Sequence, residues 1–127
     1  MRILKTVVFA EWAADEKLPD VQLQAAIHEL EDGLFDAALG AGLYKKRIAL
    51  EGRGKRGGAR TLIAYRAGAV AVFLVGFSKN ERANVSAKEL EVLRRLSKEL
   101  MSYSEQGWKR AIGAGELMEV IKNVAEN

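Results

Sequence analysis

Residues 42–60 read GLYKKRIALEGRGKRGGAR, a basic stretch that predicts two strands joined by a glycine-rich loop. Residues 41–66 hold eight Lys or Arg residues against one acid, Glu51, so this segment carries a charge of +7. The remaining 101 residues hold 12 basic and 16 acidic residues and sum to −4, so the net charge of +3 conceals a polarised molecule. Charge this concentrated indicates a polyanionic ligand, with phosphate as its obvious form.

Residues 44–50 have the period of two that is typical of a strand. One face is expected to carry Tyr44, Lys46, Ile48 and Leu50, and the other Lys45, Arg47 and Ala49. Lys45 and Arg47 would then lie roughly 6–7 Å apart, near the spacing of successive phosphates in an extended nucleic-acid strand. A half-exposed strand whose basic residues only solvate a sheet edge would show the same pattern.

Residues 51–59 hold four glycines in seven positions, which predicts a mobile or tightly turned loop rather than the interior of a strand or helix. This segment lacks the spacing of a nucleoside-triphosphate loop and precedes a strand, not a helix. We therefore expect a basic loop, with Arg53, Lys55 and Arg56, that closes over a phosphate backbone. A merely flexible cationic hairpin is the alternative.

The residues before this stretch predict one strand and two helices. Branched side chains indicate a strand over residues 3–8, followed by a short helix over 9–17. A second helix is expected from Pro19, in its first turn, to about residue 33. Its apolar stripe consists of Leu23, Ile27, Leu30 and Leu34. Residues 35–42 are expected to form a loop.

The residues after this stretch predict a hairpin and a helical end. Residues 60–66 and 70–77 should pair as antiparallel strands, the second apolar enough to be central in the sheet. The second strand leads into a loop with Lys79, Asn80 and Glu81. Ser86 and Glu89 form a capping box that opens a helix to about residue 103. A short helix over 105–112 and an edge strand over 116–121 should follow.

Composition limits the class of protein. A chain of 127 residues predicts a single domain, 1–127, in which 103–127 is a helical and strand tail. Cysteine is absent and histidine occurs once, as His28, which argues against disulfides, thiol chemistry and a zinc site. The N-terminal apolar run is too short for a signal peptide or a membrane span, so we expect a cytoplasmic protein with no membrane association.

The chemistry open to this chain is that of cations rather than of a Ser-His-Asp arrangement. The only histidine is expected on a helix away from the basic segment. The Lys and Arg residues of that segment are expected to have Tyr44, Tyr65 and Glu81 nearby in the sheet. Cleavage of RNA does not demand histidine. The 2′-OH can attack the adjacent phosphate if one group accepts its proton and cations stabilise the transition state.

Three segments together resemble the HigB-type branch of the RelE/ParE superfamily of type II toxin-antitoxin toxins. These segments are residues 42–47, residues 54–60 and residues 77–81 with Asn84. The resemblance covers most of residues 1–103, and the tail after Tyr103 is similar to one found in some members. It implies an α+β fold, a small antiparallel-dominated sheet with two N-terminal helices and a C-terminal helix.

The resemblance implies a toxin that enters the ribosomal A site and cleaves mRNA there without metal or cofactor. It also implies an antitoxin encoded alongside, often a helix-turn-helix protein, so the expected partners are antitoxin, ribosome and mRNA. By motif position Lys45 and Arg47 would hold the message and Arg60 would stabilise the transition-state phosphate. Lys79 and Glu81 would match the loop after the last central strand.

These five residues are the expected catalytic set. The expected RNA-binding residues are Lys46, Arg53, Lys55, Arg56, Tyr65 and Asn80.

The sequence departs from the family pattern at two places. Asn80 stands where well-known RelE toxins have an arginine, and Val85 and Ser86 stand where they carry a tyrosine. These departures leave the proton acceptor open. The candidates are Lys45, Lys79, Glu81 and Tyr65.

Two other functions are compatible with the sequence. One is a ParE-like toxin that binds DNA gyrase, although gyrase inhibition does not need the phosphate-binding cleft that the Lys-Arg-Gly-Gly loop suggests. The other is an RNA-binding protein or inactive toxin that does not cleave its ligand, for which affinity should fall steeply with salt while the RNA stays intact.

Overall fold

The computed structural model describes residues 1–50, 54–79, 81–82 and 84–121, with the backbone alone for residues 54–57. These residues form one six-stranded sheet in the order β2-β3-β4-β5-β1-β6. The helices and strands are β1 (Arg2–Thr6), α1 (Val7–Asp15), α2 (Asp20–Glu31), β2 (Ala37–Gly40), β3 (Leu43–Leu50), β4 (Gly54–Arg66), β5 (Val70–Ser78), α3 (Ala87–Met101), α4 (Glu105–Gly113) and β6 (Leu117–Glu119).

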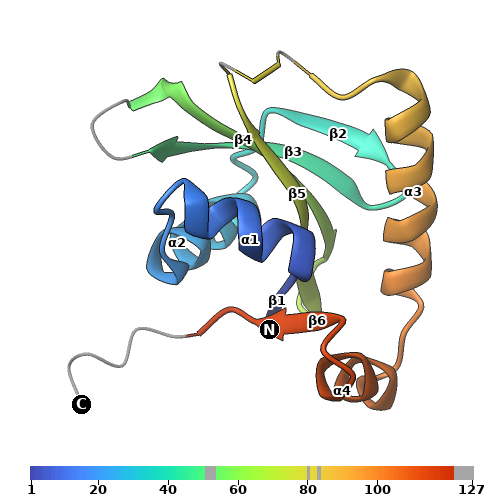
Figure 1. Ribbon diagram of the computed structural model, residues 1–127. Helices are drawn as coiled ribbons and strands as arrows, with labels where there is room; N and C mark the ends of the chain where they lie inside the picture. The colour runs from blue at the N-terminus through green and yellow to red at the C-terminus, as the bar shows by residue number, and fades with distance from the viewer. Residues whose placement is uncertain (51–53, 80, 83, 122–127) are drawn as a thin grey trace.

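Helices cover both faces of the sheet (Figure 1). The strand pairs are antiparallel except β1–β5, which is parallel, so the expected α+β fold with an antiparallel-dominated sheet is confirmed. Phe9 of α1 and Ile27 of α2 belong to the buried cluster on one face. Leu93 of α3 and Trp108 of α4 belong to the cluster on the other. We call these the α1–α2 face and the α3 face.

The hairpin, the capping box and the last edge strand are confirmed. β4 and β5 pair antiparallel, and β5 lies between β4 and β1 in the interior of the sheet. Ser86 accepts a hydrogen bond from the backbone N–H of Glu89, whose side chain accepts one from the Ser86 backbone N–H. α4 begins at Glu105, as expected, and β6 pairs with β1 at the edge of the sheet.

The prediction of a loop over residues 35–42 was wrong, because this segment contains β2. β2 pairs with β3 in a tight hairpin whose turn holds Gly40 and Gly42 at φ values of 89° and 75°. Glycine takes this left-handed conformation without steric cost, which permits the abrupt reversal. A strand of only four residues is too short to show a clear alternation.

Two further boundaries differ from the prediction. α2 ends at Glu31, and Leu34 is 58% exposed rather than part of the buried stripe, because the chain turns at Gly33 toward β2. β4 begins at Gly54, so residues 54–58 lie in a strand although their glycines predicted a loop. Pairing with β3, which reaches Leu50 opposite Gly54, overrides the weak strand preference of glycine.

No helix in the described part of the chain is long and apolar enough to cross a membrane.

Candidate nucleic-acid interface

The central feature of the site is a pair of arginines on neighbouring strands. Arg47 of β3 and Arg60 of β4 are direct Cα partners, so their side chains leave the same face of the sheet. Lys45 lies two residues before Arg47 and pairs with Leu62, which is buried on the α3 face. Three expected catalytic residues therefore share this face. Like charges directly opposite each other destabilise a sheet, which makes the arginine pair costly to the fold.

Arg60 has hydrogen-bonding capacity that the described protein does not use. Its Nη1 atom is buried and has no hydrogen-bond partner among the described residues. An arginine guanidinium carries five N–H donors in a planar fork that suits phosphate and carboxylate oxygens. The arrangement therefore provides a donor for an anion at this position.

Asp36, which the sequence did not single out, offsets part of this positive charge. It precedes β2, and its carboxylate accepts hydrogen bonds from the Arg47 backbone N–H at 2.6 Å and from Arg47 Nε at 2.8 Å. Burial alone would raise the pKa of Asp36, but the two bonds from Arg47 and the charges of Arg47 and Lys46 outweigh it and lower that pKa. Asp36 thus stays ionised and fixes the direction of the Arg47 side chain.

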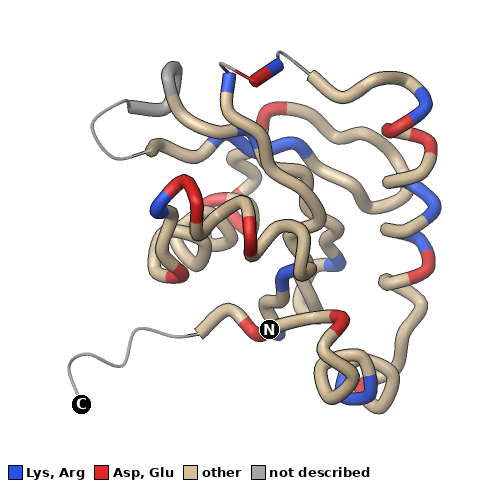
Figure 2. The backbone as a smooth tube through the Cα atoms, viewed as in Figure 1, with Lys and Arg blue, Asp and Glu red and all other residues tan. Residues whose placement is uncertain are grey.

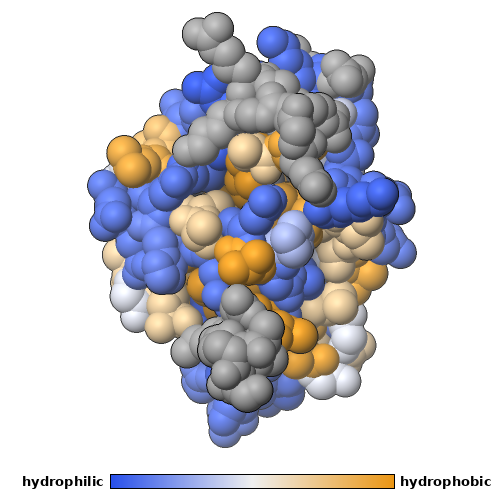
Figure 3. Space-filling view, turned by 90° about the vertical axis from the view of Figure 1, so that its left-hand side faces the viewer, coloured by the Kyte–Doolittle hydropathy of each residue, from blue (hydrophilic) through white to orange (hydrophobic). Residues whose placement is uncertain are grey.

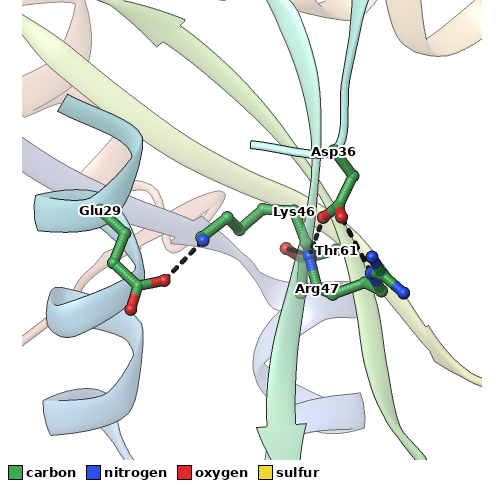
Figure 4. A network of polar contacts seen from close by, with 5 residues as sticks. All are labelled: Glu29, Asp36, Lys46, Arg47 and Thr61. Atoms are coloured by element: carbon green, nitrogen blue, oxygen red, sulfur yellow. Dashed lines mark hydrogen bonds and ion pairs between the residues drawn. The ribbon is translucent and has the colours of Figure 1, made fainter. Parts of the chain in front are cut away.

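Lys46 points away from this interface. Figure 4 shows Lys46 and Arg47 leaving β3 in opposite directions, Lys46 toward α2. Lys46 is only 4% exposed, and its Nζ lies 2.5 Å from Glu29 Oε1. The predicted alternation of the strand is therefore confirmed, but the structure does not bring Lys46 together with the arginine pair.

Tyr65 also belongs to the α1–α2 face. Its ring packs against that of Tyr44, with centroids 5.7 Å apart, beside the cluster that contains Ile27. Burial raises the pKa of Tyr65, and the negative charge of Glu31 raises it further. Tyr65 is thus separated from Arg47 and Arg60 by the sheet.

Glu81 holds the turn that follows β5. Its carboxylate accepts hydrogen bonds from the Ser78 backbone N–H at 2.8 Å and from Trp12 Nε1 at 3.2 Å. The backbone bond from Ser78 is the main reason that the pKa of Glu81 is lowered, and the bond from Trp12 adds to it. The Trp12 ring lies against Gly76, where an added Cβ would come within 2.4 Å of it. Glu81 therefore ties this turn to α1.

The other predicted residues lie at the ends of these strands. Lys79 is exposed on the turn after β5. Lys55 and Arg56 belong to the first part of β4, described only for its backbone, at the end of the β3–β4 hairpin where β3 reaches Leu50. Arg53 and Asn80 lie outside the described residues.

Arg82 is a second residue that sequence reasoning missed. Its Cζ lies 5.0 Å from the centroid of the Phe77 ring, and Phe77 is the Cα partner of Arg60. Its Nη1 also donates to both carboxylate oxygens of Glu89 at 2.8 Å. The capping box signalled Glu89 in the sequence, but nothing there indicated that Arg82 would fold back onto Phe77.

Acidic residues gather on the opposite side of the sheet. Residues 11–35, which include the second half of α1 and all of α2, hold seven Asp or Glu residues and one Lys. Figure 2 shows these acids over α1 and α2 and the basic residues along the strands. The side of the molecule that carries α2 is mostly hydrophilic, with smaller hydrophobic patches (Figure 3). The fold thus places these acids across the sheet from the arginine pair.

A groove of about 1230 Å³ lies at the other end of the sheet, where Arg2 bonds to Glu105 and Glu119 and His28 and Trp108 contribute to the lining. Within the described residues, no group of three or more His, Cys, Asp or Glu side chains is placed to hold a metal ion.

Comparison with known proteins assigns the chain to a family. The family described as "RelE toxin of RelE / RelB toxin-antitoxin system" matches residues 1–120. No curated protein sequence matches the chain. A match over this length covers every described helix and strand, and membership implies an antitoxin partner. The chain therefore belongs to the RelE family of toxins from toxin-antitoxin systems.

Proposed function

We propose that this toxin is a ribosome-dependent endoribonuclease of the HigB-type branch that cleaves mRNA in the ribosomal A site and so inhibits translation. The observation that carries the proposal is the Arg47–Arg60 pair, with Nη1 of Arg60 buried and without a partner in the described chain. RelE toxins are in general endoribonucleases. The three segments that resemble the HigB-type branch lie on β3, β4 and the end of β5, which supports the finer assignment.

Arg60 is the proposed stabiliser of the transition state. A buried donor without a partner costs about 1–3 kcal/mol, and a phosphate oxygen that takes this bond recovers that free energy. If the oxygen gains negative charge during the reaction, the bond is stronger in the transition state than in the ground state. Arg47, held by Asp36, and exposed Lys79 are proposed to hold the neighbouring phosphates.

Lys45 is the proposed proton acceptor. The sequence left four candidates, which differ in the face of the sheet that they occupy and in the hydrogen bonds that they already make. Tyr65 packs on the α1–α2 face, and Glu81 already accepts two hydrogen bonds from the protein. Lys45 shares the α3 face with the arginine pair, and its position on a paired strand is more fixed than that of Lys79 on a turn.

The proposed reaction uses Lys45 as the proton acceptor and Arg60 as the electrostatic stabiliser. The neutral amine of Lys45 takes the proton of the 2′-OH, the 2′-oxygen bonds to the adjacent phosphorus, and the bond from phosphorus to the 5′-oxygen breaks. The 5′-oxygen then takes a proton from water, and the hydroxide so formed takes the proton back from the Lys45 ammonium, which leaves a 2′,3′-cyclic phosphate and a 5′-hydroxyl. Arg60 is proposed to face the phosphate throughout the reaction. Electrostatic stabilisation of this kind is usually the largest single contribution to catalysis.

The remaining predicted residues have proposed supporting roles. Arg53, Lys55, Arg56 and Asn80 are proposed to contact the message or ribosomal RNA. Lys46 and Tyr65 are proposed to act in folding only, because they pack on the α1–α2 face. The proposed partners are the ribosome, mRNA and an antitoxin encoded alongside, with a helix-turn-helix protein as the expected kind.

The test compares the wild-type chain with Arg60→Ala and with a matched control, Arg95→Ala. Arg95 is an exposed arginine of α3 that pairs with Glu91 at 2.8 Å. It is not one of the expected site residues. Induced expression without antitoxin should arrest growth for the wild type and the control but not for Arg60→Ala. In a purified translation system, removal of Arg60 should slow mRNA cleavage on the ribosome by about 10²–10³-fold.

Three readouts separate the alternatives. A folded Arg60→Ala protein that remains fully toxic rejects the role of Arg60. Intact mRNA on the ribosome, together with loss of supercoiling activity in a gyrase assay, would instead indicate a ParE-like toxin. Intact mRNA together with salt-sensitive RNA binding would indicate a binding protein without nuclease activity.

A further inference from the structure

The side chain of Arg82 contacts Phe77 and Glu89 and is still partly exposed to solvent. Its Cζ lies 5.0 Å from the centroid of the Phe77 ring, which is itself only 2% exposed. Its Nη1 donates to both oxygens of Glu89 at 2.8 Å. The side chain of Arg82 nevertheless remains 40% exposed. The guanidinium is thus held over a ring and bonded at one nitrogen, in a side chain that solvent still reaches.

The position of Arg82 places it beside the arginine pair. Phe77 is the Cα partner of Arg60, so the Phe77 ring and the guanidinium over it lie on the α3 face. Glu89 stands at the start of α3, which the turn after β5 reaches in Figure 1. An RNA strand held by Arg47 and Arg60 would therefore pass next to Arg82.

The contacts of Arg82 favour a base over a phosphate as its ligand. Glu89 occupies Nη1 and neutralises much of its charge, and bonds from the Ser86 backbone and from Arg82 lower the pKa of Glu89 to about 2, so Glu89 stays ionised. Because Arg82 is already paired with a carboxylate, its guanidinium attracts a phosphate less strongly than that of Arg60 does. Its plane, however, remains suited to stacking, since unpaired bases stack on arginine planes as well as on aromatic rings.

We propose that Arg82, supported by Phe77 and tethered by Glu89, is the platform on which one unpaired base of the RNA stacks. The inference rests on the proposed function for its ligand, single-stranded RNA. It assigns base contact to the turn after β5 and phosphate contact to β3 and β4. Such a contact selects for an unstacked base at one position of the strand rather than for charge alone.

The experiment measures the binding of a short, labelled single-stranded RNA by fluorescence anisotropy at low salt, with a series of RNAs that each carry one abasic residue. For the wild type, one abasic position should weaken binding roughly 5- to 150-fold. Arg82→Lys keeps the charge but loses the plane, so it should bind the intact RNA more weakly by a similar factor. For Arg82→Lys, an abasic residue at that position should not reduce the affinity for RNA any further.

Two variants serve as controls. Arg95→Lys changes an arginine that also pairs with a glutamate, Glu91, but lies over no aromatic ring, so it should keep the full abasic penalty. Phe77→Leu keeps the site apolar but removes the ring, and it should reduce the penalty without loss of charge. Thermal unfolding confirms that each protein is folded before binding is compared.

The proposal fails if Arg82→Lys shows the same abasic penalty as the wild type, if no position shows a penalty, or if the wild type binds none of these RNAs. Cleavage of mRNA on the ribosome is measured in parallel and tests the proposed function separately. A wild type that cleaves but shows no base-dependent position retains the nuclease assignment and loses the platform. A wild type that does not cleave mRNA but shows the abasic penalty retains the platform and loses the nuclease assignment.

Discussion

Arg47 and Arg60 are direct partners across β3 and β4, yet their surroundings differ. Asp36 accepts hydrogen bonds from the backbone and the side chain of Arg47, whereas Nη1 of Arg60 is buried without a partner in the described chain. One arginine is thus fixed by the protein and the other retains a donor for a ligand. This asymmetry suits a site in which one cation positions RNA and the other responds to the charge that develops on it.

Asp36→Asn should lower stability and strengthen RNA binding. The substitution removes the negative charge beside two facing arginines, and because Arg47 is partly exposed the loss should be about 1 kcal/mol. Affinity for RNA should rise, since the site becomes more positive. Urea unfolding and RNA titrations measure the two effects. Asp32→Asn, at an exposed acid that ends α2, is the control and should change neither.

Lys45→Arg should separate binding from cleavage. Arginine keeps the positive charge on the α3 face but does not give up its proton, so binding to RNA should persist while ribosomal mRNA cleavage falls by about 10²–10⁴-fold. Single-turnover rates of the two proteins provide the test. A Lys45→Arg protein that cleaves at the wild-type rate would exclude Lys45 as the acceptor.

Lys46→Met should leave RNA binding unchanged. The methionine fills the space of a side chain that is buried toward α2, and Glu29, whose side chain is 38% exposed, stays accessible to water. The free energy of unfolding should therefore change by no more than about 1–2 kcal/mol. Lys45→Met is the matched comparison, one residue away on the opposite face. It should weaken RNA binding and reduce its salt dependence by about one phosphate contact.

Gly76→Ala should destabilise the protein through Trp12. The added Cβ would come within 2.4 Å of the indole ring, so the ring or the strand must shift, at a cost of about 1–3 kcal/mol. In a Trp12→Ala background the same substitution should cost much less. A double-mutant cycle by chemical denaturation measures the difference. Equal costs in both backgrounds would mean that the contact does not constrain Gly76.

Glu89→Gln should weaken the acid dependence of stability. The pKa of Glu89 is about 2 in the folded protein against a model-compound value of 4.5, because Ser86 and Arg82 bond to the ionised form. A lowered folded-state pKa contributes stability above about 4.5 that is lost as the pH falls toward 2. Wild-type stability should therefore drop over this window more steeply than that of the variant. Urea midpoints of both proteins at pH 7 and pH 3 provide the comparison. An equal fall in the two midpoints would contradict the prediction.

Local patterns were sufficient for most of the helices and strands. The alternation of residues 44–50 placed Lys45 and Arg47 on one face and Lys46 on the other, and the structure confirms this. The capping box of Ser86 and Glu89 marked the start of α3. Both signals depend on residues close in sequence, where backbone geometry alone sets which side chains meet.

Local patterns failed where distant residues decide the outcome. The glycines of residues 54–58 indicated a loop, but pairing with β3 extends the strand through them. β2 was missed because a four-residue strand is defined by its partner rather than by its own alternation. Tyr65 was grouped with the site because it was expected near the cations in the sheet, but its ring packs on the opposite face.

The sequence by itself determined a small α+β fold, the concentration of positive charge in residues 41–66 and the face of β3 on which each cation lies. Only the tertiary structure decided that Arg47 and Arg60 are partners, that Asp36 is bonded to Arg47, and that Arg82 lies over Phe77. The physical reason is the range of the interactions. Charge content and periodicity are properties of neighbouring residues, whereas strand register and the contacts across it form only when segments distant in sequence pack together.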